Sequence, residues 1–273
     1  MRFYKLFYSL AIFILIMGCT EVSPLISEEE LVVVRAYIYA GQPIDDIQLS
    51  LTMPLDTDTT HAPPINNAQI FLIKDDERYE CESTSGDSGY YHYSGEDLLF
   101  SAGDSCGIEI LYADELITSQ TVVPENPQAV SLNQTTMEIP DFNDRAAMIE
   151  WRQAGDNEIE VTWDNPGNDW YYVNLINIDA NPTAIDSWFG SALQDFVFPP
   201  INDDSFAIRL PFITHLGNHR ITVYKVNQEY VDLYESREQD TRDLNEPLTN
   251  INNGLGVFSA FNQTSVTLNV KLQ

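Results

Sequence analysis

Basic residues are scarce in this sequence. Its 273 residues contain 13 Lys and Arg against 42 Asp and Glu, so the formal net charge at pH 7 is −29. Removal of residues 1–18, argued below, deletes Arg2 and Lys5 but no acid, leaving 11 bases against 42 acids and a net charge of −31. A field of this sign repels phosphate groups and anionic lipid headgroups. The composition therefore argues against nucleic-acid binding and against electrostatic docking on anionic lipid.

The sequence also lacks the short motifs of common catalytic and metal sites. It contains neither a Gly-x-Ser-x-Gly elbow nor a Cys-x-x-Cys pair. His215 and His219 are four residues apart, which on a strand places them about 13 Å from each other, too far to share an ion. Adjacent acids such as Asp45-Asp46 stand in turns, where carboxylates are normally solvated. We therefore predict that the protein is not an enzyme and uses no cofactor.

Acidic loops leave a structural calcium ion open as an alternative. Carboxylates gather in four loops of the sequence, at Asp56–Asp58, Asp75–Glu77, Asp164–Asp169 and Asp203–Asp204. Calcium prefers such oxygen ligands, but none of the four has the spaced Asp-x-Asp-x-Asp-Gly pattern. An acidic, solvated surface is the favoured interpretation.

Near the N-terminus lies an apolar run that is too short to span a bilayer. Arg2 and Lys5 precede Leu6–Met17, whereas a spanning helix needs about 20 residues. A charged start, an apolar run and a small residue before the cut are typical of a signal peptide. Ile16–Cys19 resembles a bacterial lipobox, in which Cys19 is acylated and becomes the first mature residue. The alternatives are an ordinary secretory signal with a chance cysteine, or a buried N-terminal strand.

The residues that follow Cys19 indicate in which membrane the lipoprotein is located. Thr20 stands where an aspartate would favour retention in the inner membrane of many lipoproteins, so we expect the outer membrane. The acidic run Ser27–Glu30 resembles the signal that takes some of these lipoproteins to the cell surface, although a solvated charge run explains it as well. We predict a signal peptide over 1–18, an acidic tether over 19–30 and a body that faces the periplasm or the cell surface.

Cysteine is rare. With Cys19 acylated, Cys81 and Cys106 are the only thiols left in an exported chain, which favours a disulfide between them. The bond would close a loop of about 25 residues and stabilise the fold by roughly 3 kcal/mol through chain entropy. Two unpaired buried thiols are the alternative.

Residues 31–124 have the composition and alternation of β-strands. β-Branched and aromatic residues recur with period two between turn signals. We expect strands at 31–39, 47–53, 68–74, 78–82, 89–93, 106–112 and 116–123. Seven strands at this spacing favour an antiparallel sandwich.

A linker begins at Pro124–Pro127, and we predict that it spans 125–144; its passage to Pro140 could alternatively be one strand that crosses into the next domain. Residues 145–273 resemble a fibronectin type III domain, because an alternating strand that ends at Trp163 is followed by a polar turn and a Tyr-rich return strand. Further strands are expected at 206–211, 218–227 and 265–270, a short inserted helix at 184–196 and a helical turn within 231–243. The predicted fold class is all-β, with two antiparallel β-sandwich domains.

Clustered aromatic residues are candidates for ligand contact. Trp170–Tyr172, Tyr90–Tyr93 and the pair Trp188-Phe189 could form platforms for stacking sugars. Alternation directs one of each adjacent pair inward, so core packing is the simpler interpretation. We take Trp188, Phe189 and Trp170 as possible ligand contacts, with Trp188 the best candidate for exposure.

Several stretches together resemble one known family. They are Cys19, then Leu31–Val34 with Gly41 and Pro43, then Pro64–Ile70, Gly89–Tyr91, Asn245–Pro247 and Asn250–Phe258. Their order is similar to that of the outer-membrane lipoprotein family called domain of unknown function four-two-four-nine, found in Bacteroidetes-type Gram-negative bacteria. The N-terminal half is also similar to transthyretin-like carboxypeptidase regulatory domains. The family offers no catalytic residues to transfer.

The resemblance implies a function. Members commonly accompany TonB-dependent receptors of the outer membrane, which implies a role in nutrient uptake or receptor assembly. We therefore expect a lipid-anchored, non-enzymatic accessory of such a receptor; a surface module that captures glycans or peptides, or an adhesin subunit, is the alternative. Gly254 and Gly256 flank Leu255 and suggest a bend with positive φ, after which Val257 and Phe258 enter the core. A contact with a partner is the alternative role for this segment.

Overall fold

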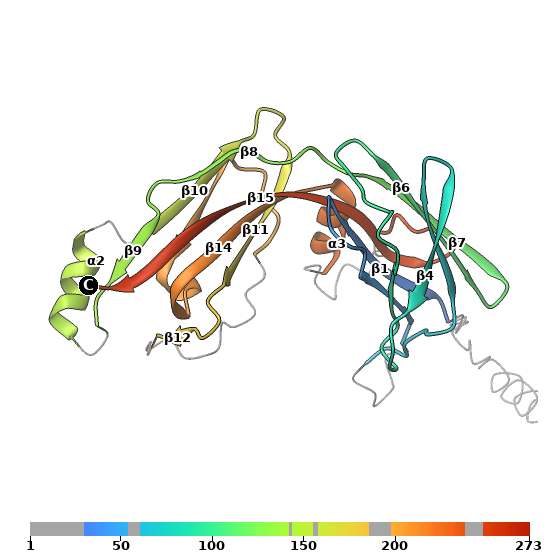
Figure 1. The fold of residues 1–273 in the computed structure, drawn as a ribbon, viewed down its shortest axis with the longest axis horizontal. Helices are drawn as coiled ribbons and strands as arrows, with labels where there is room; N and C mark the ends of the chain where they lie inside the picture. Colours follow the sequence, from blue (N-terminus) through green and yellow to red (C-terminus); the bar gives the residue numbers. More distant parts are fainter. Residues whose placement is uncertain (1–29, 54–60, 142–143, 155–157, 186–197, 238–247) are drawn as a thin grey trace, which may run out of the picture. The chain divides into compact units, whose positions relative to one another are not determined.

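The computed structural model describes residues 30–53, 61–141, 144–154, 158–185, 198–237 and 248–273 (Figure 1). The chain divides into two compact units, Met1–Glu30 and Leu31–Gln273, and the fold below is that of the second. Strands dominate it, which confirms the all-β fold class. None of the helices within the described ranges has the length and apolar character needed to cross a bilayer.

Seven strands form the N-terminal sandwich, as the alternation predicted. They are β1 (Val32–Tyr39), β2 (Asp46–Leu51), β3 (Gln69–Lys74), β4 (Glu77–Ser83), β5 (Tyr90–His92), β6 (Ser105–Tyr112) and β7 (Glu115–Val122). Their order in the sheet is β1-β2-β5-β4-β3-β6-β7. Alternate residues are buried throughout β1, in β2 as far as Leu49 and in β6 as far as Ile110, so one face of each strand builds a common core that includes Ile38.

Two tight turns set the register of the hairpins in this sandwich. Asp75-Asp76 joins β3 to β4, and Ala113-Asp114 joins β6 to β7. All four residues have positive φ, as the central pair of a type I′ turn requires. Asp tolerates this conformation better than most residues, because its short side chain can bond locally.

The C-terminal sandwich packs two sheets on a second core. Its strands are β8 (Gln128–Leu132), β9 (Thr136–Ile139), β10 (Glu158–Asp164), β11 (Trp170–Asn177), β12 (Thr183–Ala184), β13 (Ser205–Arg209) and β14 (His215–Val226). One sheet has the order β13-β10-β8, and the other contains β11 and β14 with β9 and β12. Val161 and Ile208 from the first sheet meet Val173 and Val223 from the second in one buried cluster.

The final strand, β15 (Leu255–Leu272), belongs to both sandwiches. Its first residues pair in parallel with β1, from Val33 with Leu255 to Tyr39 with Phe261. From Phe261 onward it pairs with β14, and its last residues pair in parallel with β9. Figure 1 shows β15 running from β1 to β9. Phe258 therefore lies in the first core and Leu268 in the second.

This sharing of β15 differs from the expected division of the chain. The segment 125–144 was expected to be a linker, but β8 and β9 within it are strands of the C-terminal sheets. The segment 145–273 was expected to form the second domain alone, yet Ile251 and Phe258 are buried in the first core. Sequence patterns show where strands lie but not which distant strand each one joins.

Three helical segments accompany the sheets in the described part of the chain. Helix α2 (Arg145–Ala154) was not predicted; its Trp151 is buried and donates its indole N–H to the carbonyl of Glu138 at 2.9 Å. Helix α3 (Gln228–Arg237) begins three residues before the expected helical turn. A short 3₁₀ helix, η2, spans Leu210–Phe212. Most of the helix expected at 184–196 lies outside the described residues.

Candidate functional site

Seven aromatic residues gather where β1, β11, β14, β15 and α3 meet. We call this set the junction cluster: Tyr37, Tyr39, Trp170, Tyr172, Tyr224, Tyr230 and Phe261. The outward positions of β1 supply Tyr37 and Tyr39, while its inward positions fill the first core. Trp170, one of the predicted ligand contacts, is half-buried and packs against the buried residues of this region, Val226, Val231 and Phe261.

Phe261 is the centre of the junction cluster. Its ring stacks on Tyr39 with centroids 5.2 Å apart, and the rings of Tyr37 and Tyr230 approach it edge-on at 5.4 and 5.0 Å. Such aromatic pairs each contribute about 0.5–1.5 kcal/mol beyond the area they bury. Burial raises the pKa of Tyr172 to about 12, so its hydroxyl stays protonated at neutral pH. The cluster thus offers apolar ring surface and neutral hydroxyls.

Arg35 lies beside the junction cluster on the outward face of β1. Its guanidinium carbon is 5.5 Å from the ring centres of both Tyr37 and Tyr90, within the range of a cation–π contact. Nη2 donates to the Tyr90 hydroxyl at 2.7 Å and forms an ion pair with Asp46 at 3.1 Å. Desolvation raises the pKa of Asp46, an effect that the nearby Arg35 charge opposes. This cation is thus held by partners within the chain.

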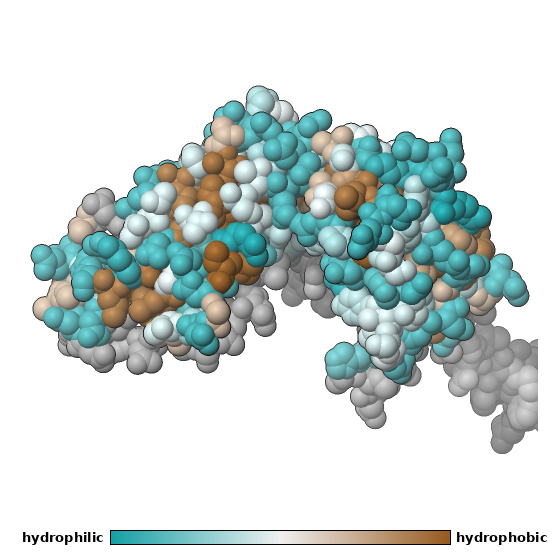
Figure 2. Space-filling model, in the orientation of Figure 1, coloured by the Kyte–Doolittle hydropathy of each residue, from teal (hydrophilic) through white to brown (hydrophobic). Residues whose placement is uncertain are grey.

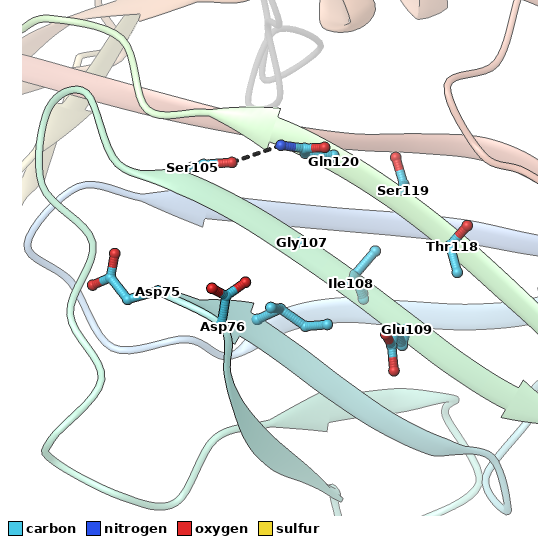
Figure 3. A pocket seen from close by; sticks show the side chains of 10 residues that line it. Asp75, Asp76, Ser105, Gly107, Ile108, Glu109, Thr118, Ser119 and Gln120 are labelled. Carbon is cyan, nitrogen blue, oxygen red and sulfur yellow. Dashed lines mark hydrogen bonds between the residues drawn. The ribbon is translucent and has the colours of Figure 1, made fainter.

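A second candidate site is a depression over β6 and β7. Its volume is about 430 Å³, and Figure 3 shows the residues that line it. The side chains of Asp75 and Asp76 come from the β3–β4 turn, Glu109 comes from β6, and Thr118 and Gln120 come from β7. A Cβ at Gly107 would lie 3.2 Å from Cβ of Ile73, so glycine keeps this position open.

The lining of this depression is rich in hydrogen-bond acceptors, because it includes the carboxylates of Asp75, Asp76 and Glu109. No Lys or Arg lines it, and Gln120 donates to the Ser105 hydroxyl at 2.7 Å across its wall (Figure 3). Glu109 is bonded to Arg78, which leaves the two aspartates of the turn as the acids at the rim. A ligand with hydroxyl or ammonium donors fits this lining better than an anion does.

The predicted disulfide is absent from the structure. Both Cys81 on β4 and Cys106 on β6 are free and buried, which is the alternative that the sequence left open. Strand β3 lies between β4 and β6, so the two cysteine backbones are separated by two strand spacings, about 10 Å. A disulfide needs Cα atoms closer than about 7 Å. Burial raises the pKa of Cys81 to about 12, so this thiol is unreactive.

Three predicted site residues lie outside the described ranges. They are Cys19, Trp188 and Phe189. The structure therefore does not test lipidation of Cys19 or ligand contact by Trp188 and Phe189.

The remaining polar candidates stand apart from one another. His219 is buried in β14, with Asn177 Nδ2 at 3.4 Å from its Nε2 and the Gly217 carbonyl at 3.1 Å from its Nδ1. Nδ1 of His215 instead lies 2.8 Å from the Thr214 hydroxyl. Across the part of the chain that the structure describes, no three His, Cys, Asp or Glu side chains come together as a metal site. Asp56–Asp58, one of the acidic loops weighed for calcium, falls outside that part.

The glycine-rich segment near the C-terminus completes the N-terminal sandwich. Asn250 acts as a clamp on the following strand: its Nδ2 donates to the Phe258 carbonyl at 2.7 Å, and its Oδ1 accepts from the Phe258 N–H at 3.0 Å. Asn252 pairs with Thr118 through backbone bonds at the outer edge of β7. Of the two glycines predicted to form the bend, Gly256 has positive φ, +103°, whereas Gly254 does not; Val257 and Phe258 are buried. Within this structure the segment has a packing role.

Sequence reasoning missed Arg35 and the tyrosines of β1 as a surface feature. The signal was present, because strict alternation in residues 32–39 puts Arg35, Tyr37 and Tyr39 on one face and Val34, Ala36 and Ile38 on the other. The ring partners of Tyr37 and Tyr39 come from β14, β15 and α3, more than a hundred residues away. Alternation within one strand cannot identify them.

The chain is similar to a solved structure and to one protein family. The crystal structure of chicken CNTN1 FN1-FN3 domains matches with 11% identity and a TM-score of 0.24, covering 88% of this chain and 64%, or less than two thirds, of that one. No curated protein matches. The model of one family, described as a domain of unknown function (DUF4249), matches residues 20–267. The chain therefore belongs to the DUF4249 family.

Proposed function

We propose that this protein is a non-enzymatic lipoprotein of the outer membrane that assists a TonB-dependent receptor in nutrient uptake. The observation that carries the proposal is the start of the folded body. The first strand begins at Val32, directly after the acidic segment that follows the lipobox cysteine. A folded body this close to an acylated Cys19 is held at the membrane.

The tether length sets the mechanism. Eleven residues, 20–30, lie between Cys19 and Leu31, and the twelve Cα–Cα steps from Cys19 to Leu31 reach about 40 Å when the chain is fully extended. The N-terminal sandwich is thereby confined near the bilayer, where a receptor in the same membrane meets it at a high effective concentration. Weak contacts then suffice for a stable association. The acidic body supports solubility and disfavours attachment to anionic lipid through charge alone.

Copurification tests the proposed partner. The full lipidated chain with a C-terminal tag is extracted in mild detergent from its own cells and captured. We expect a TonB-dependent receptor to be enriched over the amount recovered with an unrelated, equally abundant outer-membrane lipoprotein. The Cys19→Ser variant is the matched control, and it should recover less receptor because it loses the tether. Equal recovery with the unrelated lipoprotein would contradict the proposal.

The acceptor-lined depression favours a second candidate function, the capture of a glycan or peptide. Asp76 stands at its rim, and Asp114 occupies the equivalent position of the other type I′ turn. Asp76→Asn should therefore weaken binding to any hit on a glycan or peptide array, whereas Asp114→Asn should not. Both changes keep a residue that tolerates positive φ. Equal binding by the two variants would remove the depression as the capture site.

A further inference from the structure

Four large apolar side chains remain exposed at one end of the N-terminal sandwich. Leu31, Met53, Leu111 and Leu116 are 38%, 39%, 40% and 45% exposed, respectively, and we call them the Leu31 rim. Figure 2 shows that the visible face of the protein is mostly hydrophilic, with smaller hydrophobic areas. Single exposed leucines are common, so the rim has meaning only if its members lie together.

Backbone contacts place the members of the rim in two adjacent pairs. The N–H of Leu31 donates to the Thr52 hydroxyl at 3.1 Å, and the N–H of Thr52 donates to the Leu31 carbonyl at 2.9 Å. Met53 follows Thr52 directly, so it lies beside Leu31. Leu111 and Leu116 are directly opposite each other at the end of the β6–β7 hairpin.

Gly254 links the two pairs. A Cβ on this residue would lie 3.0 Å from the carbonyl oxygen of Val32 and 3.4 Å from Cγ2 of Ile117. Val32 follows Leu31 and Ile117 follows Leu116, so both pairs flank the same glycine. The neighbouring Asn253 donates its side-chain amide to the Leu116 carbonyl at 2.9 Å. All four rim residues therefore lie at one end of the sandwich.

The chain reaches the sandwich at this same end. Strand β1 begins at Val32 beside the rim and ends at Tyr39 in the junction cluster, where β15 leads on to the second sandwich. Only residues 20–30 separate the rim from the proposed acylated cysteine, Cys19. Glu30, Asp114 and Glu115 are exposed near the rim, and their charges oppose contact with anionic lipid.

We propose that the Leu31 rim docks on a neutral lipid surface, with its leucines at the boundary between headgroups and acyl chains. The proposal rests on the anchoring part of the proposed function. A few apolar side chains are weak membrane ligands by themselves, but the lipid anchor and its short tether keep them at a high effective concentration beside the bilayer. The sandwich then stands on the bilayer at its Leu31 end.

A fluorophore at Leu116 tests the proposal on the full lipidated chain. The buried Cys81 and Cys106 resist alkylation, so Leu116→Cys gives one reactive thiol for an environment-sensitive dye. The control is Leu99→Cys, also an exposed position. Its carbonyl accepts from Lys74 at the far end of β3, away from Gln69, which pairs with Leu111. Both proteins are reconstituted in vesicles of phosphatidylcholine and phosphatidylethanolamine.

We expect a several-fold rise in emission at position 116, with quenching by nitroxide-labelled lipid, and neither effect at position 99. Adding Leu31→Glu should abolish the signal at position 116, whereas adding Leu99→Glu should leave it unchanged. A protein that floats with vesicles while position 116 stays silent would overturn docking and leave anchoring intact. A rise without lipid quenching would overturn docking on lipid and assign the rim to contact between two copies of this chain. A chain that does not float would overturn anchoring and docking together.

Discussion

Gly256 allows the last strand, β15, to begin its pairing with β1. Its φ of +103° lies in a region that other residues rarely adopt, and an added Cβ would lie 2.0 Å from the carbonyl oxygen of Val34. The backbones of β15 and β1 approach each other too closely at this point for any side chain. Family resemblance in the segment Asn250–Phe258 therefore has a physical basis in packing.

Gly256→Ala should destabilise the fold by about 3 kcal/mol or more, because the clash with Val34 adds to the backbone strain. Gly41→Ala is the matched control: Gly41 also has positive φ, but nothing lies within 4 Å of its added Cβ. That variant should lose only about 1 kcal/mol. Urea unfolding of both variants measures the difference, and equal losses would contradict the packing role.

His219 gives stability a pH dependence. Burial lowers its pKa below the ordinary value of 6.5, so the fold favours the neutral ring. Because the unfolded chain binds the proton more readily, this contribution to stability is full above about pH 6.5 and is lost as pH falls below it. The stability difference between the native protein and His219→Gln should therefore shrink from about pH 8 to about pH 5. Urea midpoints at each pH test this, and a constant difference would count against it.

At the scale of elements, α3 is held to two strands by a small polar network. Glu229 Oε1 accepts from the Thr121 hydroxyl on β7 at 2.6 Å and lies 3.3 Å from the Ser259 hydroxyl on β15. Asn227 donates to the Val122 carbonyl at 2.8 Å just before the helix. Thr121 and Ser259 are buried, so both would lose a partner without water to replace it.

Glu229→Ala should therefore cost about 2 kcal/mol of unfolding free energy. Glu235→Ala on the same helix changes an exposed glutamate and should cost less than about 0.5 kcal/mol. Thermal unfolding of the two variants makes the comparison. If both variants unfold at the same temperature, the network does not hold α3 in place.

The sequence predicts those strands and turns that are determined by residues close together in the chain. Seven strands before residue 125 and most strands after it follow from alternation, as in Val32–Tyr39, and from turn residues such as Asp75-Asp76. It does not predict features that depend on contacts between residues far apart in the chain. The disulfide was wrong because β3 separates Cys81 from Cys106, and β15 was expected only at 265–270 because its pairing with β1 joins residues far apart in sequence.

The candidate sites also depend on contacts between distant residues, which the sequence does not show. Trp170 was picked out from composition, but its role in the junction cluster depends on rings from β1, β14, β15 and α3. The depression over Gly107 depends on the juxtaposition of β6, β7 and the Asp75-Asp76 turn, which the sequence does not reveal. Asn250 was recognised only as part of a family segment, because its two bonds to Phe258 need the folded chain.

At the scale of the whole molecule, the N-terminal sandwich is incomplete without the end of the chain. Ile251, Phe258 and Ala260 fill the first core, and β15 covers the edge of β1. A fragment ending at residue 144 should therefore lack a cooperative unfolding transition, whereas the chain Leu31–Gln273 should show one. Near-UV circular dichroism during urea unfolding tests this. A cooperative transition in the short fragment would show that β15 is dispensable.

In the function proposed for this acidic, all-β protein, acylation of Cys19 holds the chain in the outer membrane. Labelling growing cells with radioactive palmitate detects that acylation. We expect label in the native protein and none in Cys19→Ser, which should also leave the membrane fraction. An unlabelled native protein, or a Cys19→Ser variant that stays in the membrane, would contradict this proposal.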